Sequence, residues 1–306
     1  MWNRVLDRAG VPDPGLRRDY TLQRRAVRRY RPAEYTAARL LLPAALLPDV
    51  VAAVAFMHET DDRVDRGARD ERAAALAAWD GHVRKALDGG DAELPVLRCL
   101  VRTVERTPAL RAHVEEFLRG AEREAEWRGV ADEDDFAAYV RAYSLPGLML
   151  TACLLAPADP VRRAAFTDGC HRIIAGMQRL DFLEDLSEDL REGRPGVPAD
   201  ALARHGAEPS RPDAALGRVV AEQADRAAAE LAGGEGVEAA VDDAFRPFVR
   251  ALLGVQRLRL DAVRRAGASL AVRTSGPAPA AAAALLLREW RARRAGKGPR
   301  APDRPF

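Results

Sequence analysis

The sequence predicts an all-α protein that folds as one large helical domain. Apolar residues recur three and four residues apart along nearly the whole chain, which is the period of an amphipathic helix. Alternating runs of β-branched residues, the pattern of a half-buried strand, are few. With 306 residues, 48% of them hydrophobic, the chain is long enough to bury a large core. Together these observations favour a single-domain helical bundle.

Proline and glycine mark where the expected helices begin and end. We expect an N-terminal lead over residues 1–15, a helical domain over residues 16–294 and a disordered basic tail over residues 295–306. Within the domain, helices are expected at about residues 16–30, 47–66, 71–87, 94–107, 110–129, 134–155, 165–191, 214–232, 236–267 and 279–294.

The helix expected at residues 134–155 is the most apolar of these, and Pro146 interrupts it. Because proline lacks a backbone N–H, it kinks the helix and leaves carbonyl groups without a partner. Those carbonyls either face a reaction cavity and a developing carbocation or belong to an ordinary kinked core helix, and the sequence allows both interpretations.

The composition limits which binding partners and which cellular compartment are expected. A net charge of +2 gives no basic stripe for nucleic acid. Three cysteines without metal-ligand spacing, no visible signal peptide and apolar runs too short to span a bilayer favour a cytoplasmic protein. The last helix, at residues 279–294, has an apolar Ala/Leu body and an arginine-rich end. It either docks on the domain or makes a peripheral membrane contact.

Residues 178–198 concentrate carboxylates on one helix face. Asp181, Glu184, Asp185, Glu188 and Asp189 are spaced three and four apart, so a helix would place all five within about three turns. Like charges at this spacing repel one another, which predicts a cation at the acidic face. Oxygen ligands without histidine or cysteine suit Mg²⁺ better than zinc. The alternative is a solvated acidic face on an amphipathic helix.

A second acidic pair, Asp61 and Asp65, lies four residues apart in the helix expected at residues 47–66. Two helices that each present such a pair can face each other and hold several Mg²⁺ ions. Those ions would bind a diphosphate that the carboxylates alone would repel. The sequence therefore indicates a metal-dependent site for a diphosphate.

The two acidic segments carry a family resemblance. From about residue 20 to about residue 290, the chain resembles the squalene/phytoene synthase family of isoprenoid enzymes. Asp61-Asp62-Arg63-Val64-Asp65 is similar to the family's first aspartate-rich motif. Residues 178–198 match the second motif without a gap. The resemblance implies an isoprenoid-synthase bundle with a central apolar cavity.

The resemblance also implies a magnesium cluster, with Mn²⁺ as a substitute. The matching metal ligands are Asp61, Asp62, Asp65, Asp181, Asp185 and Asp189. Gln178 and Arg194 in the second motif are expected to bind substrate. Asp181 stands where the family usually has Asn, and Glu184 stands where it usually has Arg. The second motif is therefore expected to be more acidic and poorer in phosphate-binding cations than in relatives.

Two positions expected to bind substrate depart from the family near the first motif. The family's Ser-x-Ser-Phe flap falls on residues 32–35, where Tyr35 keeps the aromatic ring but both serines are missing. His58 stands where the family usually has Arg three residues before the motif. A protonated His58 would donate to phosphate; a surface or packing histidine is the alternative.

Further departures fall in the kinked helix. With Gly147 aligned to the family's pattern, Arg141 takes the place of a tyrosine and Leu150 the place of a glycine. Tyr139 and Tyr143 lie close enough in sequence to substitute, so Tyr139, Arg141 and Tyr143 are the catalytic candidates. Leu150 adds volume to the wall of the expected substrate tunnel.

The resemblance implies an enzyme that ionises an allylic prenyl diphosphate and condenses two such substrates head to head. A single-substrate class I terpene synthase on the same scaffold is the main alternative, because the altered positions belong to parts that place two substrates. A non-catalytic prenyl-lipid-binding protein is the third. The facing carboxylates argue against it, because they would destabilise a protein that binds no cation. Chain length of the substrate and oligomeric state stay open.

Overall fold

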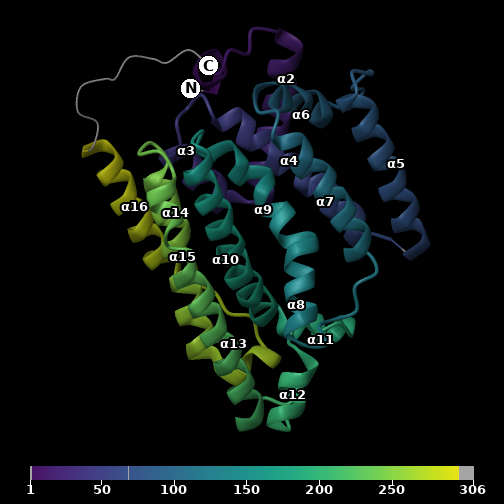
Figure 1. Ribbon diagram of the computed structural model, residues 1–306, viewed down its shortest axis with the longest axis vertical. Coiled ribbons are helices and arrows are strands. Elements are labelled where there is room, and N and C mark those ends of the chain that lie inside the picture. The colour runs from purple at the N-terminus through teal and green to yellow at the C-terminus, as the bar shows by residue number, and fades with distance from the viewer. Residues whose placement is uncertain (1, 68, 296–306) are drawn as a thin grey trace.

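The computed structural model describes residues 2–67 and 69–295, and every regular element within them is a helix (Figure 1). The predicted all-α class is confirmed. The elements are α1 (Trp2–Arg8), α2 (Pro14–Tyr30), α3 (Pro32–Leu41), α4 (Leu47–Asp65), α5 (Arg69–Leu87), α6 (Pro95–Arg106), α7 (Leu110–Glu124), α8 (Glu133–Tyr139), η1 (Val140–Ser144), α9 (Leu145–Ala152), η2 (Cys153–Leu155), α10 (Pro160–Glu184), α11 (Leu186–Glu192), α12 (Ala199–His205), α13 (Ala214–Gly233), α14 (Val237–Ala240), α15 (Arg246–Ala266), η3 (Gly267–Ala271) and α16 (Pro279–Ala295).

Most of the expected helices are confirmed to within a few residues, with differences at both ends of the chain. The expected lead contains α1, whose Leu6 is fully buried in a small core with Tyr20 and Ala52. The expected basic tail falls on residues 296–306, outside the described residues, apart from Ala295, which ends α16. Residues 236–267 form two helices, α14 and α15, separated by a turn before Arg246.

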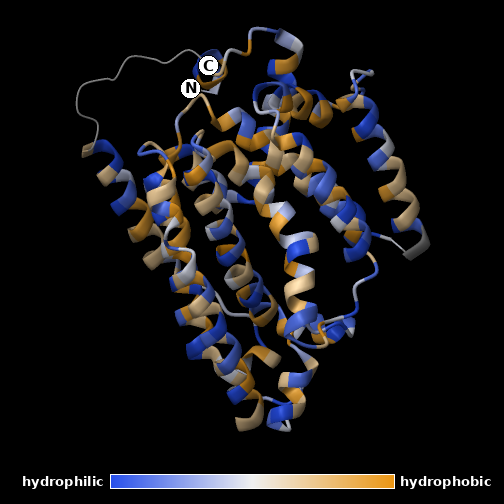
Figure 2. Ribbon diagram, in the orientation of Figure 1, coloured by the Kyte–Doolittle hydropathy of each residue, from blue (hydrophilic) through white to orange (hydrophobic). Residues whose placement is uncertain are grey.

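α10 lies in the middle of the bundle and packs along α13 (Figure 1). On one side α13, α15 and α16 run roughly alongside one another, and on the other side α2, α4 and α6 pack together. Figure 2 shows apolar and polar residues interleaved along most helices, as expected where each helix turns one face to the core. This arrangement brings the helices that carry the two acidic motifs, α4 and α10–α11, into one body.

Two apolar cores hold the bundle together. The larger includes Phe56, Phe117 and Leu150 and joins α4, α7 and α9. The smaller joins α10 to α13 and α15 through residues such as Leu180 and Val263. Full burial of side chains of this size stabilises the fold by about 1.5–3 kcal/mol each. The cores hold the acidic helices rigidly, which a geometrically defined site requires.

A π-helical turn, η1, stands where the sequence predicts a kink. Pro146 has no N–H to donate to the Ala142 carbonyl, and the Leu145 N–H bonds instead to Val140, five residues back. The Ala142 carbonyl packs against α7, where a Cβ on Gly120 would lie only 2.2 Å from its oxygen. The carbonyl freed by Pro146 therefore faces α7 and not a reaction cavity. Gly120 is required because any side chain would push α7 away from η1.

By length and hydropathy, Glu133–Leu155 is the one described segment that could cross a membrane, and 44% of its most apolar window is buried in the fold. Core helices meet the same criterion, so this property by itself assigns no membrane span.

The last helix, α16, is docked on α3 and α15. Leu285 is 9% exposed and fits against Gly254, where a Cβ would lie 2.8 Å from the leucine methyl groups. Glu289 is buried and paired with Arg250 at 2.8 Å. The Arg293 guanidinium donates to the Leu40 and Leu42 carbonyls at 2.6 and 2.9 Å. α16 thus docks on the domain through Leu285 and Glu289, while Leu287 stays 43% exposed.

Candidate active site

The first acidic motif occupies the last turn of α4 and presents Asp61 and Asp65 on one face. The Tyr143 hydroxyl of η1 donates to Asp61 Oδ1 at 3.0 Å. Burial raises the pKa of Asp61 to about 6, and the hydrogen bond from Tyr143 opposes this shift. On the opposite side of the helix, the Trp79 indole donates to the buried Thr60 hydroxyl at 2.9 Å. This contact fixes the rotation of α4 and hence the direction of its carboxylates.

Asp62 points to a different side of α4. It pairs with Arg66 at 3.2 Å and lies 3.8 Å from His58, both one turn away on the same helix. The His58 ring stacks on Tyr30, with ring centroids 3.7 Å apart. Because consecutive residues are about 100° apart around a helix, Asp61 and Asp62 cannot share a face. The prediction of Asp62 as a metal ligand therefore has no support in this geometry, and His58 packs against an aromatic ring.

The second motif is not one continuous helix. α10 ends at Glu184 and α11 begins at Leu186, because Asp185 leaves helical geometry at φ −91° and ψ 1°. Partial burial raises the pKa of Asp185 to about 6, and the nearby carboxylates of Asp181 and Glu184 raise it further. Burial and the charge of Asp185 likewise raise the pKa of Asp189 to about 6. Asp185 and Asp189 thus form a carboxylate pair that lacks full neutralisation.

The loop after α11 places Arg194. Gly193 closes the helix with φ +73°, a left-handed conformation that favours glycine. A Cβ on Gly196 would lie 2.2 Å from the Phe182 ring, so only glycine lets the loop fold back onto α10. The Arg194 guanidinium is held by Glu192 at 2.6 Å.

The remaining acidic residues of the motif are neutralised by Arg259, which sequence analysis did not identify. This arginine of α15 is 13% exposed and bonds to Glu184 at 3.0 Å and to Asp181. A cation therefore does lie at the acidic face, as the sequence predicts, and it is a side chain; Asp181 is an ion-pair partner here, and its role as a metal ligand stays a prediction. Arg259 comes from α15, 75 residues further along the chain than Glu184.

Both acidic motifs face one space. Burial raises the pKa of Asp65 in the first motif and of Asp189 in the second, and the positive charge of Arg194 opposes both shifts. Arg31, at the junction of α2 and α3, likewise lies within electrostatic reach of Asp61 and of Asp181. Two arginines that each lie within electrostatic reach of both motifs indicate that the motifs lie near each other.

An aromatic cluster borders this space. Trp127 stacks on Phe182 with centroids 5.3 Å apart, and Tyr139 lies 5.4 Å from Phe182 and 6.0 Å from Tyr143. Glu124 of α7 lies beside Tyr139, and burial raises its pKa to about 7. Its Oε2 atom is buried without a hydrogen-bond partner among the described residues.

Comparison with known proteins agrees with this geometry. The sequence profile described as squalene/phytoene synthase matches residues 28–292. The chain belongs to this family. The phytoene synthase of Mycobacterium tuberculosis is 28% identical over 223 residues, which cover 70% of this chain and 72% of that protein. Members of the family are prenyltransferases, so the chain is an enzyme of this class.

Solved structures show the same fold. Squalene synthase HpnC from Alicyclobacillus acidocaldarius superposes with a TM-score of 0.75 at 24% identity, over 85% of this chain and 98% of that one. A dehydrosqualene synthase, solved in complex with a ligand, gives 0.78 at 18% identity, over 92% and 98%. The predicted isoprenoid-synthase bundle is confirmed.

Three residues aligned to this family's substrate or catalytic positions are either buried in the core or turned to the outer surface. Leu150 has no exposed surface and is part of the larger core, so it lines no solvent-accessible tunnel. Tyr35 is 7% exposed and packs in the same core, because the expected flap is part of helix α3. Arg141 is exposed and lines a hollow on the outer side of η1, opposite the side from which Tyr143 reaches Asp61.

Gln178 lies on α10 one turn before Asp181, and its Oε1 accepts a hydrogen bond from the Ser144 hydroxyl at 2.9 Å. This bond ties α10 to η1, so it fixes the position of the second motif relative to Tyr143. A substrate-binding role for Gln178 stays a prediction.

The donor set fits magnesium. Within residues 2–67 and 69–295, no three metal-ligating side chains converge on one point. Mg²⁺ keeps several waters and binds proteins through one or two carboxylates together with substrate phosphates, so a site split between two facing pairs suits it. Burial raises the pKa of Asp61, Asp65, Asp185 and Asp189, and neighbouring carboxylates raise each pKa further.

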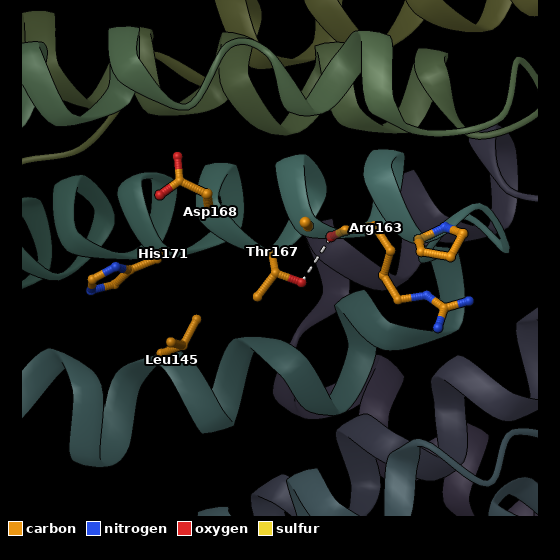
Figure 3. A pocket seen from close by; sticks show the side chains of 7 residues that line it. Leu145, Arg163, Thr167, Asp168 and His171 are labelled. Carbon is orange, nitrogen blue, oxygen red and sulfur yellow. Dashed lines mark hydrogen bonds between the residues drawn. The ribbon is translucent and has the colours of Figure 1, made fainter.

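Two hollows of the surface, of about 790 and 590 Å³, lie on the side formed by α7, α9 and α10. Figure 3 shows the smaller one, between Leu145 of α9 and the side chains of α10. Neither is lined by a residue of the acidic motifs. The central apolar cavity stays a prediction.

Proposed function

We propose that this enzyme condenses two prenyl diphosphates head to head in a magnesium-dependent reaction. The observation that carries the proposal is the pair of carboxylate sets, Asp61 with Asp65 and Asp185 with Asp189, that lie within electrostatic reach of one cation, Arg194. Bound Mg²⁺ would neutralise the diphosphate leaving group and promote cleavage of the carbon–oxygen bond. The metal ligands are these four aspartates, with Asp62 and Asp181 engaged in ion pairs beside them.

Arg31 and Arg194 are the groups of this chain that bind the diphosphate directly. Both are cations between facing carboxylates, where an anion without positive partners would be repelled. A guanidinium presents several donors in a plane that matches phosphate oxygens. Arg194 is oriented for this by Glu192, and Arg31 by Tyr30, whose ring lies 4.8 Å from the guanidinium carbon.

The aromatic cluster supports a cationic intermediate. An allylic cation is stabilised by the faces of aromatic rings, which Tyr139, Phe182 and Trp127 supply next to the acidic motifs. The hydroxyl of Tyr143 donates to Asp61, so its proton is held at that carboxylate and the ring stays fixed. Phe117 stacks on Tyr143 with centroids 5.4 Å apart and excludes water from behind the ring.

The decisive experiment is a product assay. The purified chain is incubated with Mg²⁺ and either farnesyl or geranylgeranyl diphosphate, and the extracted hydrocarbon is analysed by mass spectrometry. A product with twice the carbon count of the substrate supports condensation. A product with one substrate's carbon count would replace the proposal by a single-substrate cyclase, and no release of diphosphate would leave a prenyl-lipid-binding protein.

Two variants separate this chemistry from folding. Asp185→Asn should abolish product formation, because it removes a carboxylate of the second pair. Asp225→Asn is the matched control, since Asp225 is 75% exposed on α13 and pairs only with Arg264. It should leave product formation unchanged.

We also propose that the enzyme works in the cytoplasm. Cys99, Cys153 and Cys170 are free and buried, as expected in a reducing compartment. Fractionation of cells that express the tagged chain tests this location.

A further inference from the structure

The two hollows on the side of α7, α9 and α10 join into one groove, because Leu145, Arg163 and Thr167 line both. We call it the flank groove. In Figure 3, Leu145, Thr167 and His171 lie along the gap between α9 and α10. The floor is apolar and consists of Leu145, Pro146, Met149, Cys153 and Ala156. It belongs to no part of the candidate active site.

The rim of the flank groove is cationic. Four arginines line it: Arg119, Arg123, Arg141 and Arg163. The first three are exposed and form no ion pair with any residue in 2–67 or 69–295. Two acidic residues also line the groove, and each has a partner: Glu116 lies 3.3 Å from His113, and Asp168 lies 3.2 Å from Arg172. Asp168 also points away from Leu145 (Figure 3). The groove therefore presents unpaired positive charge around an apolar floor.

Apolar surface continues beyond the floor. The segment that contributes α9, Glu133–Leu155, is the most membrane-like in the described chain, and less than half of its apolar window is buried. Val161 of α10 is 79% exposed, the largest exposure among the described large hydrophobic residues. Pro160 and Arg163, on either side of it in sequence, both line the groove. An apolar surface ringed by arginine is the chemistry that matches an anionic lipid.

We propose that the flank groove is the face with which the protein docks on an anionic lipid bilayer. The four arginines bind headgroup phosphates, while Val161 and the groove floor contact acyl chains. The inference does not depend on the proposed reaction. If that reaction holds, docking also places the enzyme beside the phase that dissolves a hydrocarbon product. α16 is not the docking element, because its buried face packs on α3 and α15.

The test is sedimentation of the purified full chain with vesicles, in the absence of substrate. One set of vesicles is phosphatidylcholine alone, and the other contains about a third phosphatidylglycerol. Binding is expected only to the second set. It should weaken as the salt concentration rises, because salt screens the attraction between the arginines and the anionic headgroups. Each arginine near such a surface contributes about a fivefold gain in affinity. The double variant R119E/R141E should therefore bind at least about thirtyfold more weakly.

The matched control is R25E/R29E on α2. It makes the same change of net charge at two exposed arginines on another arginine-rich surface. It should bind within about twofold of the unaltered chain. A third variant, Val161→Asp, should lower the fraction that stays bound at high salt, since it removes the apolar contact. Circular dichroism verifies that all variants keep their helices.

Two results would overturn the proposal. If the unaltered chain does not bind vesicles that contain phosphatidylglycerol, the arginine rim binds another anionic partner, such as an acidic protein. If R25E/R29E loses as much binding as R119E/R141E, overall charge and not the flank groove governs attraction. Neither result bears on the product assay, so failure here leaves the proposed reaction untouched.

Discussion

The Arg259 guanidinium donates to the Glu184 carboxylate at 3.0 Å, and this ion pair joins α15 to the end of α10. Both side chains are 13% exposed, so neither charge is well screened by water. Glu184 immediately precedes Asp185, and Arg259 also pairs with Asp181. Its position makes the charge balance of the second motif depend on a helix outside the motif.

We expect the Arg259–Glu184 pair to tolerate a charge swap better than either single reversal. Glu184→Arg or Arg259→Glu alone leaves like charges facing each other at low exposure, which should cost about 3–5 kcal/mol of unfolding free energy. The double variant should recover at least half of this, because the guanidinium moved onto α10 would still lie one turn from Asp181. Urea denaturation of the unaltered chain, the two single variants and the double variant gives the coupling free energy between the two side chains.

The control for this cycle is the exposed pair Asp225–Arg264, with side-chain exposures of 75% and 45%. Its reversals should change stability by at most about 1 kcal/mol. If E184R/R259E is as unstable as the worse single variant, Arg259 acts through Asp181 and not through Glu184.

We expect the hydroxyl of Tyr143 to support activity by orienting Asp61. Tyr143→Phe keeps the ring but removes the donor that holds Asp61 Oδ1 at 3.0 Å. Groups that orient a metal ligand typically contribute ten- to a hundredfold to metal affinity or activity. We expect a loss of this size in kcat and a higher Mg²⁺ concentration at half-maximal rate.

The matched control is Tyr20→Phe, which removes a buried hydroxyl that donates to Cys99 in the contact between α2 and α6. It should lower the melting temperature and leave the Mg²⁺ dependence unchanged. Equal Mg²⁺ dependence in Tyr143→Phe and the unaltered chain would mean that the hydroxyl does not orient Asp61.

Substitution of Asp61 should lower activity far more than substitution of its neighbour Asp62. Asp61→Asn removes a carboxylate that faces the second motif, and the lost charge stabilisation should lower kcat/KM by about a hundredfold or more. Asp62→Asn removes a partner of the exposed Arg66 and should cost about fivefold at most. The increase in melting temperature with Mg²⁺ and inorganic diphosphate gives a second readout.

That increase should be lost in Asp61→Asn and kept in Asp62→Asn. The reverse pattern would assign the metal to the outer side of α4, and the two motifs would then not share their ions.

The fold was predictable because each helix carries its own signals. Periodic apolar residues and flanking proline or glycine located α4, α6 and α13 to within a few residues. The break at Asp185 was not predictable, because no glycine or proline marks it. η1 was anticipated only as a kink, since the sequence shows Pro146 but not the close packing on Gly120 that directs the freed carbonyl.

The candidate site was predictable only in part. Spacing located the four facing aspartates, and the 100° step of a helix could have separated Asp62 from them. Arg259 could not be inferred, because its partners lie 75 and 78 residues away in sequence. Arg31 is one of many arginines near the N-terminus, and only the tertiary structure shows which one faces the acidic motifs.

The last helix should stabilise α3 through Arg293. This guanidinium donates to the Leu40 and Leu42 carbonyls at the end of α3, and burial lowers its pKa. Arg293→Ala leaves both carbonyls without these donors, which should cost about 1–3 kcal/mol of unfolding free energy. Arg294→Ala is the matched control, because Arg294 is exposed and, among the described residues, stacks on Trp290 alone, so it should cost about 1 kcal/mol at most. Hydrogen exchange should show faster amide exchange in α3 for Arg293→Ala alone. Unchanged exchange there would mean that α16 packs on α3 without holding it.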